Sequence, residues 1–161
     1  TPGHIALLEA QHKFLISGDT LLPTIDTNAA FHVQHIAYPL QKYLDSLTVL
    51  QTLDFETVLP GHEDVFHNPR QRIEELFKNH EHKAGVIARL FTDSQPHNAY
   101  QVSQMLARSP RSNTSRWGNM TGWAKRFAVL QTIAHLESLK FNRLLSSAEV
   151  NGVQYFKSAG G

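Results

Sequence analysis

Two short apolar runs, each ended by a turn and a polar side chain, most constrain what this chain can fold into. One is "KFLISGD", which ends at Asp19, and the other is "FETVLPGH", which ends at His62. Both runs predict short buried strands that glycine or proline terminates. Between them, leucines at helical spacing follow Pro39 and predict a helix that begins at this proline. Because a strand, a helix and a second strand follow one another, we expect an α/β layer.

The neighbouring segments extend this layer on both sides. The run "HIALLEA" precedes "KFLISGD" and should pair with it as a hairpin. Asn68 and Pro69 predict the start of a helix that reaches residue 91. The expected inner face of this helix contains Ile73, Leu76, Phe77, Ile87 and Leu90.

From Asn98 onward the pattern changes to helices followed by a hairpin. "AYQVSQMLA" predicts a short helix, and residues 121–140 predict a long one. The expected inward side chains of the long helix are Trp123, Phe127, Leu130 and Ile133. Asn151-Gly152 joins two strand-like runs and is the strongest short signal for a hairpin. Three helices and a hairpin are the order of a winged-helix domain, so we expect two domains, residues 1–68 and 69–161.

The two parts of the chain carry opposite net charges. Residues 1–96 contain seven Lys/Arg and twelve Asp/Glu, whereas residues 97–161 contain eight Lys/Arg and two Asp/Glu. This asymmetry indicates two modules with different partners, although a basic surface that only keeps a domain in solution is the alternative. No apolar run is long enough to span a membrane. We expect a cytoplasmic protein with no membrane partner.

Asp19 and His62 form the candidate site that the residues themselves suggest. Each follows a predicted strand, and in layered α/β folds the loops beyond strand ends converge on one rim, where ligands and metals bind. The chain has ten histidines and no cysteine, so imidazole and carboxylate are its available metal ligands. The simpler alternatives are that Asp19 caps the next segment and that His62 belongs to a turn.

The other histidines of the helices are expected to have ordinary roles. His80 and His82 are two positions apart on a predicted helix, face apart and cannot share a metal. His135 lies on the long apolar helix and is expected in a core or an interface.

Three segments in one order resemble a known family. "TPGH", "FLISGD" and "VLPGHEDVF" resemble the C-terminal half of the metallo-β-lactamase superfamily of metal-dependent hydrolases. "PRQRIEELFKNHEHKAGVI", "AYQVSQML", "RFAVLQTIAHLESL" and "VNGVQYF" resemble the winged-helix appendage of the lactamase-like protein 2 group. The resemblance implies an α/β (α+β) fold, namely the C-terminal half of an αββα sandwich followed by a small winged-helix domain.

The resemblance also implies roles for the two candidate residues. In that superfamily Asp19 would be the carboxylate that bridges two metals, and His62 would be the last histidine of the second metal site. Gly61 would let the backbone turn sharply, so that His62 points at a metal. The parent enzyme would contain two zinc ions, or other divalent metals, and a metal-bound hydroxide would attack an ester-like or phosphodiester centre.

Two features depart from the family pattern. The HxHxDH signature, which supplies most of the metal ligands, does not occur in this sequence, so we expect this chain alone to be inactive. His4 stands in "TPGH", but it lies only 15 residues before Asp19. Because many members carry two successive PGH motifs, we expect His4 to be the second, non-ligating histidine, with the true ligand before Thr1. The alternative is that His4 itself is a metal ligand.

The resemblance and the basic C-terminal part together favour RNA phosphodiesters as the substrate of the parent enzyme. The expected partner is the missing N-terminal half of the same protein. Hydrolysis of a small ester or thioester, by a thioesterase or lactonase of the glyoxalase-II type, is the alternative activity. A non-catalytic module for nucleic-acid binding or for oligomerisation, such as a homo-oligomer, is the alternative from a different class.

Overall fold

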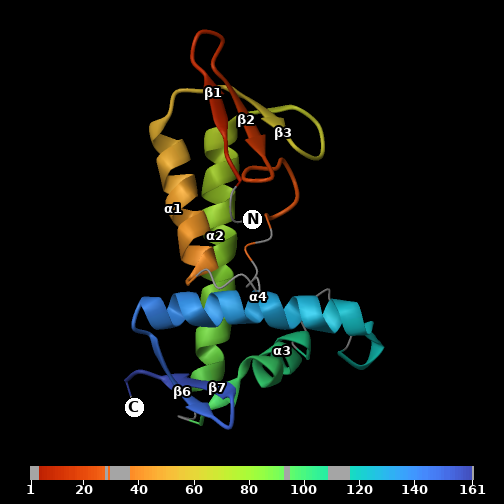
Figure 1. The fold of residues 1–161 in the computed structure, drawn as a ribbon, viewed down its shortest axis with the longest axis vertical. Coiled ribbons are helices and arrows are strands. Elements are labelled where there is room, and N and C mark those ends of the chain that lie inside the picture. The colour runs from red at the N-terminus through yellow and green to blue at the C-terminus, as the bar shows by residue number, and fades with distance from the viewer. Residues whose placement is uncertain (1–3, 28, 30–36, 93–94, 109–116, 161) are drawn as a thin grey trace. The chain divides into compact units, whose positions relative to one another are not determined.

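The computed structural model describes residues 4–27, 29, 37–92, 95–108 and 117–160. The chain divides into two compact units (Figure 1). The first unit takes its described residues from 1–29 and 41–81, and the second takes them from 30–40 and 82–161. The predicted mixed α/β class is confirmed, because the described ranges contain four α-helices and two sheets. The domain boundary expected between residues 68 and 69 stays a prediction.

The first unit contains a four-stranded sheet. Its strands are β1 (Leu7–Glu9), β2 (Phe14–Gly18), β3 (Thr57–Pro60) and β4 (Phe66–His67), in the order β1-β2-β3-β4. β1 and β2 form the predicted antiparallel hairpin, and β2 pairs with β3 in parallel. β4 pairs antiparallel with β3 and was not predicted, because a strand of two residues carries no period.

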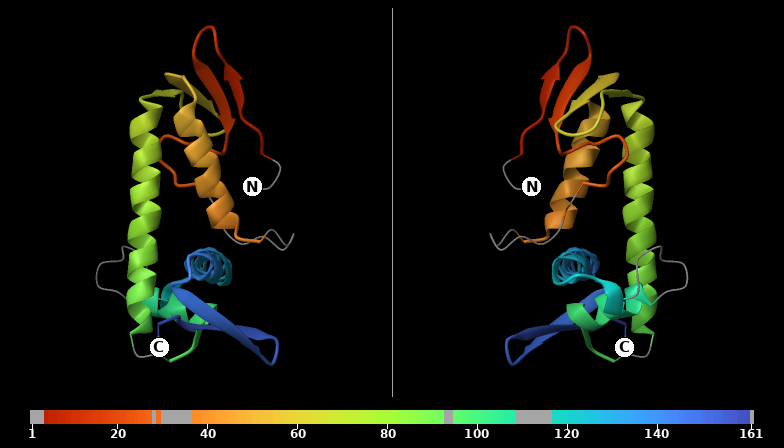
Figure 2. Two further views of the ribbon diagram at one scale, coloured as in Figure 1. Left: turned by 90° about the vertical axis from the view of Figure 1, so that its left-hand side faces the viewer. Right: turned by 90° about the vertical axis from the view of Figure 1, so that its right-hand side faces the viewer.

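Two helices accompany this sheet. α1 (Pro39–Thr52) begins at the predicted proline, and α2 (Pro69–Ala88) also begins with a proline, where the missing N–H is not needed. Figure 2 shows α1 and α2 side by side. The buried apolar residues of the first unit come from both helices, the sheet and the loops between them: Leu15, Leu21, Leu22, Tyr43, Leu47, Leu50, Phe55, Val58, Ile73 and Leu76.

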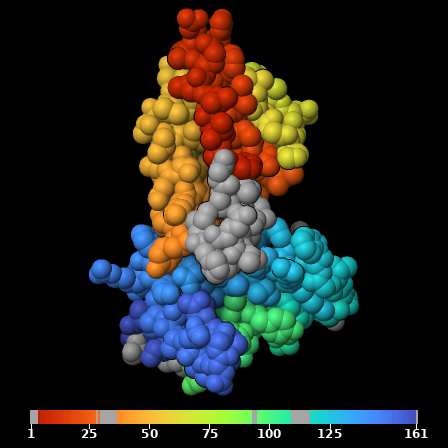
Figure 3. All heavy atoms as spheres, in the orientation of Figure 1, coloured from red at the N-terminus to blue at the C-terminus, as the bar shows by residue number. Residues whose placement is uncertain are grey.

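The sheet has one covered face and one open face. Alternate side chains of β2 differ in burial: Leu15 is 1% exposed and Ile16 is 46% exposed. Leu7 of β1 pairs with Ile16 and is 55% exposed, and an open depression beside it is lined by Phe14, Ile16 and Leu59 among others. In Figure 3, the β1–β2 hairpin lies at the surface. When a sheet with antiparallel pairs leaves one face to solvent, the side chains on that face are usually polar, so the exposed Leu7 and Ile16 are unusual.

The second unit contains the C-terminal part of α2 and the elements that follow it. These are the 3₁₀ turn η1 (Arg89–Phe91), β5 (His97–Asn98), α3 (Ala99–Ala107), the 3₁₀ turn η2 (Trp117–Asn119), α4 (Gly122–Phe141), β6 (Leu145–Val150) and β7 (Val153–Ser158). The three strands form an antiparallel sheet in the order β5-β7-β6. The core of this unit consists of Ile87, Phe91, Ala99, Val102, Leu136, Leu139, Leu145 and Phe156.

Local signals in the second unit agree with the structure. α3 has the predicted bounds, and its start is fixed by a capping box, in which the Asn98 side chain accepts from the Gln101 N–H and the Gln101 side chain accepts from the Asn98 N–H. The predicted hairpin turn is confirmed, with φ of 51° at Asn151 and 75° at Gly152. Two positive φ values are what a two-residue hairpin turn of the Asn-Gly type requires.

The inward face predicted for α4 is wrong at Trp123. This side chain lies in the first turn of the helix and is 75% exposed. The buried positions of α4 all lie further along: Thr132, Ala134, His135, Leu136, Ser138 and Leu139. There, Ser103 of α3 donates a hydrogen bond of 2.9 Å to Thr132. The helical period shows which residues share a face, but it does not show how far along the helix a packing partner extends.

Candidate metal centre

Asp19 and His62 are brought into direct contact. Asp19 follows β2 and His62 follows β3, and these two strands are parallel neighbours, so their carboxyl ends meet at one edge of the sheet. The His62 Nδ1 atom lies 2.5 Å from the Asp19 Oδ1 atom. Their side chains are 73% and 33% exposed, respectively, so the pair opens to solvent.

The backbone before the two residues is tied together. The Gly61 N–H donates a 2.8 Å hydrogen bond to the Gly18 carbonyl oxygen. A Cβ atom placed on Gly61 would lie 2.9 Å from the Asp19 Oδ1 atom and 3.2 Å from the Gly18 carbonyl carbon. The chain does bend at Gly61, and the expectation that this bend points His62 at a metal stays a prediction. Glycine is needed here because the two strand ends approach closely, and the positive φ lies at the next-but-one residue, Glu63.

His4 lies near this pair. A Cβ atom on Gly18 would be 3.6 Å from the His4 Nδ1 atom, so the His4 ring lies beside the glycine that precedes Asp19. In the described ranges, however, no three His, Asp or Glu side chains form a group that could hold a metal ion together. Asp19 and His62 are thus a two-residue donor set, and the interpretation of His4 as the non-ligating histidine stays a prediction.

The two donors suit a divalent metal. Carboxylate oxygen and imidazole nitrogen are the ligands that zinc takes when no thiolate is available. Catalytic zinc sites usually have about three protein ligands, so Asp19 and His62 fit one part of such a site. By their chemistry, their contact and their exposure, the two side chains are suitable as a partial donor set for a divalent metal.

The three helical histidines that were expected to have ordinary roles lie away from the Asp19–His62 pair. His80 is buried against Tyr43, with ring centroids 5.7 Å apart. His135 is buried as well, and its Nδ1 atom lies 3.0 Å from the Gln131 carbonyl oxygen, as expected for a core position. His82 and His135 both line a cavity of about 510 Å³ within the second unit. Arg111 and Arg116, two of the eight Lys/Arg residues in the basic C-terminal part, lie outside the described residues.

The fold and the site define a class: an α/β protein with a pair of metal-type ligands at the carboxyl ends of adjacent parallel strands. Residues 1–62 match the family model described as "Metallo-beta-lactamase superfamily". No curated protein sequence matches the chain significantly.

Two solved structures share the fold of nearly the whole chain. One is a beta-lactamase domain protein from Burkholderia ambifaria, at 28% identity and a TM-score of 0.80, with 95% of this chain and 43% of that chain covered. The other is a metallo-beta-lactamase family protein from Thermus thermophilus, at 28% identity and a TM-score of 0.75, with 96% of this chain and 45% of that chain covered. Residues 1–62 are therefore similar to the metallo-beta-lactamase superfamily, and nearly the whole chain shares the fold of two proteins with related descriptions.

These alignments have two consequences. Their coverage of this chain includes the second unit, so both units have counterparts in the two structures. The chain spans less than half of the length of either structure.

None of the helices in the described ranges is long and apolar enough to cross a membrane.

Proposed function

We propose that this chain is the C-terminal part of a metal-dependent hydrolase in which Asp19 and His62 are metal ligands. The observation that supports this most is the 2.5 Å contact between the two side chains at the ends of parallel strands, in a chain that resembles a hydrolytic superfamily. Bound divalent metals would lower the pKa of a water molecule and stabilise the negative charge that develops on the substrate.

The residues of this chain have separate tasks in the proposal. Asp19, with two carboxylate oxygens, can bind two ions or one ion and a water molecule. His62 uses Nδ1 toward Asp19, and the Nε2 atom of this largely exposed side chain is the nitrogen that we propose for a metal. Gly61 keeps the space beside the Asp19 carboxylate free of a side chain. We propose that the metal is zinc and that the parent enzyme binds two zinc ions.

The open face of the first sheet supports an N-terminal half as the partner. Leu7 and Ile16 expose about half of their surface there, on a sheet that contains a parallel pair. Burying apolar surface of this kind stabilises by about 25 cal/mol per Å², so a second layer on this face is favoured. We propose that residues outside this chain form that layer and supply the remaining metal ligands.

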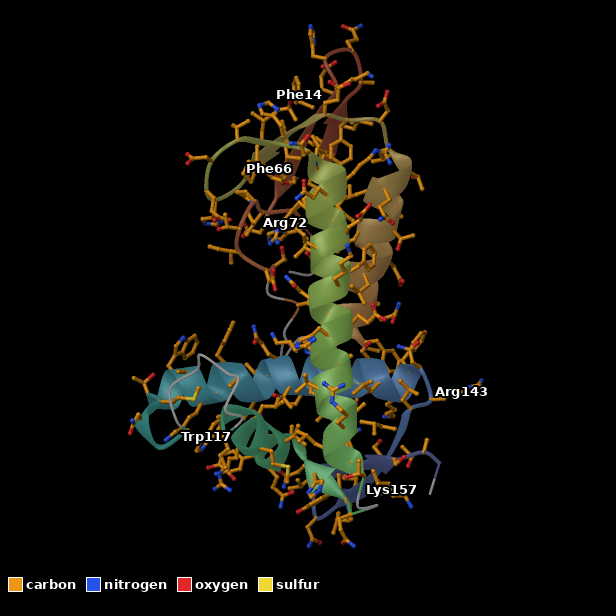
Figure 4. The ribbon with its side chains drawn as sticks, turned by 180° about the vertical axis from the view of Figure 1, so that it is seen from behind. Phe14, Phe66, Arg72, Trp117, Arg143 and Lys157 are labelled. Carbon is orange, nitrogen blue, oxygen red and sulfur yellow. The ribbon has the colours of Figure 1, made fainter. Side chains whose placement is uncertain are left out.

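The second unit supports a nucleic-acid substrate. Its order of helix, strand, helix, helix and hairpin, with the sheet order β5-β7-β6, is the basis on which we propose a winged-helix domain. The Lys125 ammonium lies 5.9 Å from the centre of the Trp117 ring, which also contacts Tyr100 edge-on. Trp117 is partly exposed and Tyr100 is 51% exposed, and accessible aromatic rings beside cations can stack on unpaired bases while the cations contact phosphates. Figure 4 labels Trp117, Arg143 and Lys157, which come from different elements of this unit.

RNA cleavage is the direct test of the proposed activity. The full-length protein should cleave a single-stranded RNA oligonucleotide, a chelator should stop the reaction, and added zinc should restore it. Hydrolysis of a thioester or lactone without RNA cleavage would instead support the glyoxalase-II type of activity. Metal-replete protein that hydrolyses none of these substrates but binds RNA would support the non-catalytic alternative and contradict the proposed hydrolase.

Salt dependence tests the role of the second unit. If Lys125 and Arg126 contact phosphates, replacing both with alanine should reduce the slope of log K against log salt by about 1.4, because each contact to a single strand contributes about 0.7. A matched control replaces Lys42 and Lys78, two lysines of the first unit, and removes the same charge. Equal slopes for both double variants would contradict a specific phosphate-binding surface on α4.

A further inference from the structure

Residues 20–27, here called the strap, follow Asp19 directly and fold back onto it. The Ser17 hydroxyl donates to the Leu21 carbonyl oxygen at 2.8 Å. The Thr27 hydroxyl donates to the carbonyl oxygen of Asp19 itself, also at 2.8 Å. Leu21 and Leu22 are buried, which fixes the first part of the strap in the core of the first unit. The backbone position of Asp19 therefore depends on the conformation of the strap.

Arg72 of α2 holds the strap from the core side. Its Nε atom donates to the Leu22 carbonyl oxygen at 2.8 Å, and its Nη2 atom donates to the Ile25 carbonyl oxygen at 3.0 Å and to the Asp26 carboxylate at 3.2 Å. The Arg72 side chain is only 9% exposed. A planar guanidinium carries its donors on separate nitrogens at fixed positions and so reaches acceptors that lie apart, whereas a lysine has all of its donors on one nitrogen. Figure 4 shows Arg72 on α2, on the side of the strap.

Glu63 holds the same strap from the solvent side. Its Oε2 atom accepts hydrogen bonds from the backbone N–H groups of Thr24 and Ile25, both at 3.2 Å. Its Oε1 atom accepts a hydrogen bond from the Thr24 hydroxyl. The Thr24 side chain, followed by the Ile25 and Thr24 backbone groups, holds the pKa of the Glu63 carboxyl below its ordinary value. Glu63 is itself exposed and is not part of the buried core of the first unit.

The position of Glu63 in the chain determines which two segments these hydrogen bonds connect. Glu63 follows His62, and the strap follows Asp19, so the bonds join the two segments that carry the candidate ligands. On the other side of the ligands, the Gly61–Gly18 backbone hydrogen bond joins the same two segments. Glu63 also has a φ of 66°, a left-handed conformation that is uncommon outside glycine and persists where surrounding contacts hold it.

We infer that Glu63 is a positioning residue for the two candidate metal ligands: through the strap, it holds Asp19 and His62 at the separation that one metal site needs. This inference rests on the proposed function of the two ligands. It assigns no contact between Glu63 and the metal or the substrate. Groups that hydrogen-bond a metal ligand directly typically change metal affinity by about 10- to 100-fold when they are removed, and Glu63 acts one step further out, so we expect an effect at the lower end of this range.

The test compares Glu63→Ala with Asp64→Ala in the full-length protein. Both variants remove one negative charge near the site, but Asp64 is exposed and makes no hydrogen bond with the described part of the chain. Zinc affinity is measured by competition with a chelator. Glu63→Ala should weaken zinc binding about 10-fold or more, Glu63→Gln should lie between it and the wild type, and Asp64→Ala should stay near the wild type. An equal loss in Glu63→Ala and Asp64→Ala would overturn the inference, since general electrostatics would explain both.

A second measurement needs no metal. Amide hydrogen exchange at Thr24 and Ile25 should accelerate in Glu63→Ala and remain unchanged in Asp64→Ala, because only the first variant removes the acceptor of these N–H groups. Unchanged exchange in Glu63→Ala would also overturn the inference. If the wild type binds no zinc while exchange responds as expected, the proposed metal site fails and the link between the two segments stands. The two failures are therefore distinguishable.

Discussion

Replacing Asp19 with alanine in the full-length protein should abolish hydrolysis and leave the fold largely intact. The Asp19 side chain is one-third exposed and contacts His62, not the apolar core, so its removal leaves no cavity. In the proposed site it binds metal, and its loss should lower kcat/KM by about 10³-fold or more, since metal ions supply several kcal/mol of transition-state stabilisation. Steady-state kinetics and zinc content check the first expectation, and denaturant unfolding checks the second.

His62 and His4 provide the internal comparison for this experiment. His62→Ala should also be severe, but residual metal should distinguish it from Asp19→Ala, because in the resembled site only one metal depends on the histidine. His4→Ala should have little effect if His4 is the non-ligating histidine. Activity retained in Asp19→Ala would contradict the metal assignment. A loss in His4→Ala as deep as in Asp19→Ala would show that His4 is a ligand.

Arg72→Ala should lower the free energy of unfolding by about 3 kcal/mol, because hydrogen bonds to a charged group contribute roughly 1.5–3 kcal/mol each and the buried acceptors would lose their donor. The affected acceptors are the carbonyl oxygens of Leu22 and Ile25, together with the partly exposed Asp26 carboxylate. Urea unfolding of the variant, monitored by circular dichroism, measures this difference.

Arg70→Ala is the matched control for Arg72→Ala. Arg70 lies on the same helix, is exposed and makes one 3.2 Å hydrogen bond to the Gln51 carbonyl oxygen. Its replacement should change the free energy of unfolding by about 0.5 kcal/mol, as is usual for surface substitutions. Similar losses in both variants would contradict the role of Arg72 as the buried anchor of the strap.

The sequence alone was sufficient for the elements whose signals are local. The Asn151-Gly152 turn, the start of α1 at Pro39 and the bounds of α3 each follow from a few neighbouring residues. The apolar runs that end before Asp19 and His62 also predicted two strands whose ends carry these side chains. Turn chemistry, capping and hydrophobic period act over one or two turns of backbone, so a single sequence contains them in full.

Only the tertiary structure decided how distant segments meet. Asp19 and His62 are 43 residues apart, and their contact depends on the parallel pairing of β2 with β3. The short strands β4 and β5 exist because a neighbouring strand supplies their hydrogen bonds, not because of any period of their own. Trp123 fits the apolar period of α4 and is nevertheless exposed, because the packed part of that helix begins further along.

The hydrogen bonds that hold the strap show most clearly what the sequence alone could not predict. Glu63 and Arg72 read in the sequence as ordinary charged residues, and nothing local links either of them to residues 20–27. Their hydrogen bonds reach 38 to 50 residues along the chain, to backbone groups that any amino acid provides. Backbone acceptors and donors carry no sequence signature, so such an anchor becomes visible only when the chain is folded.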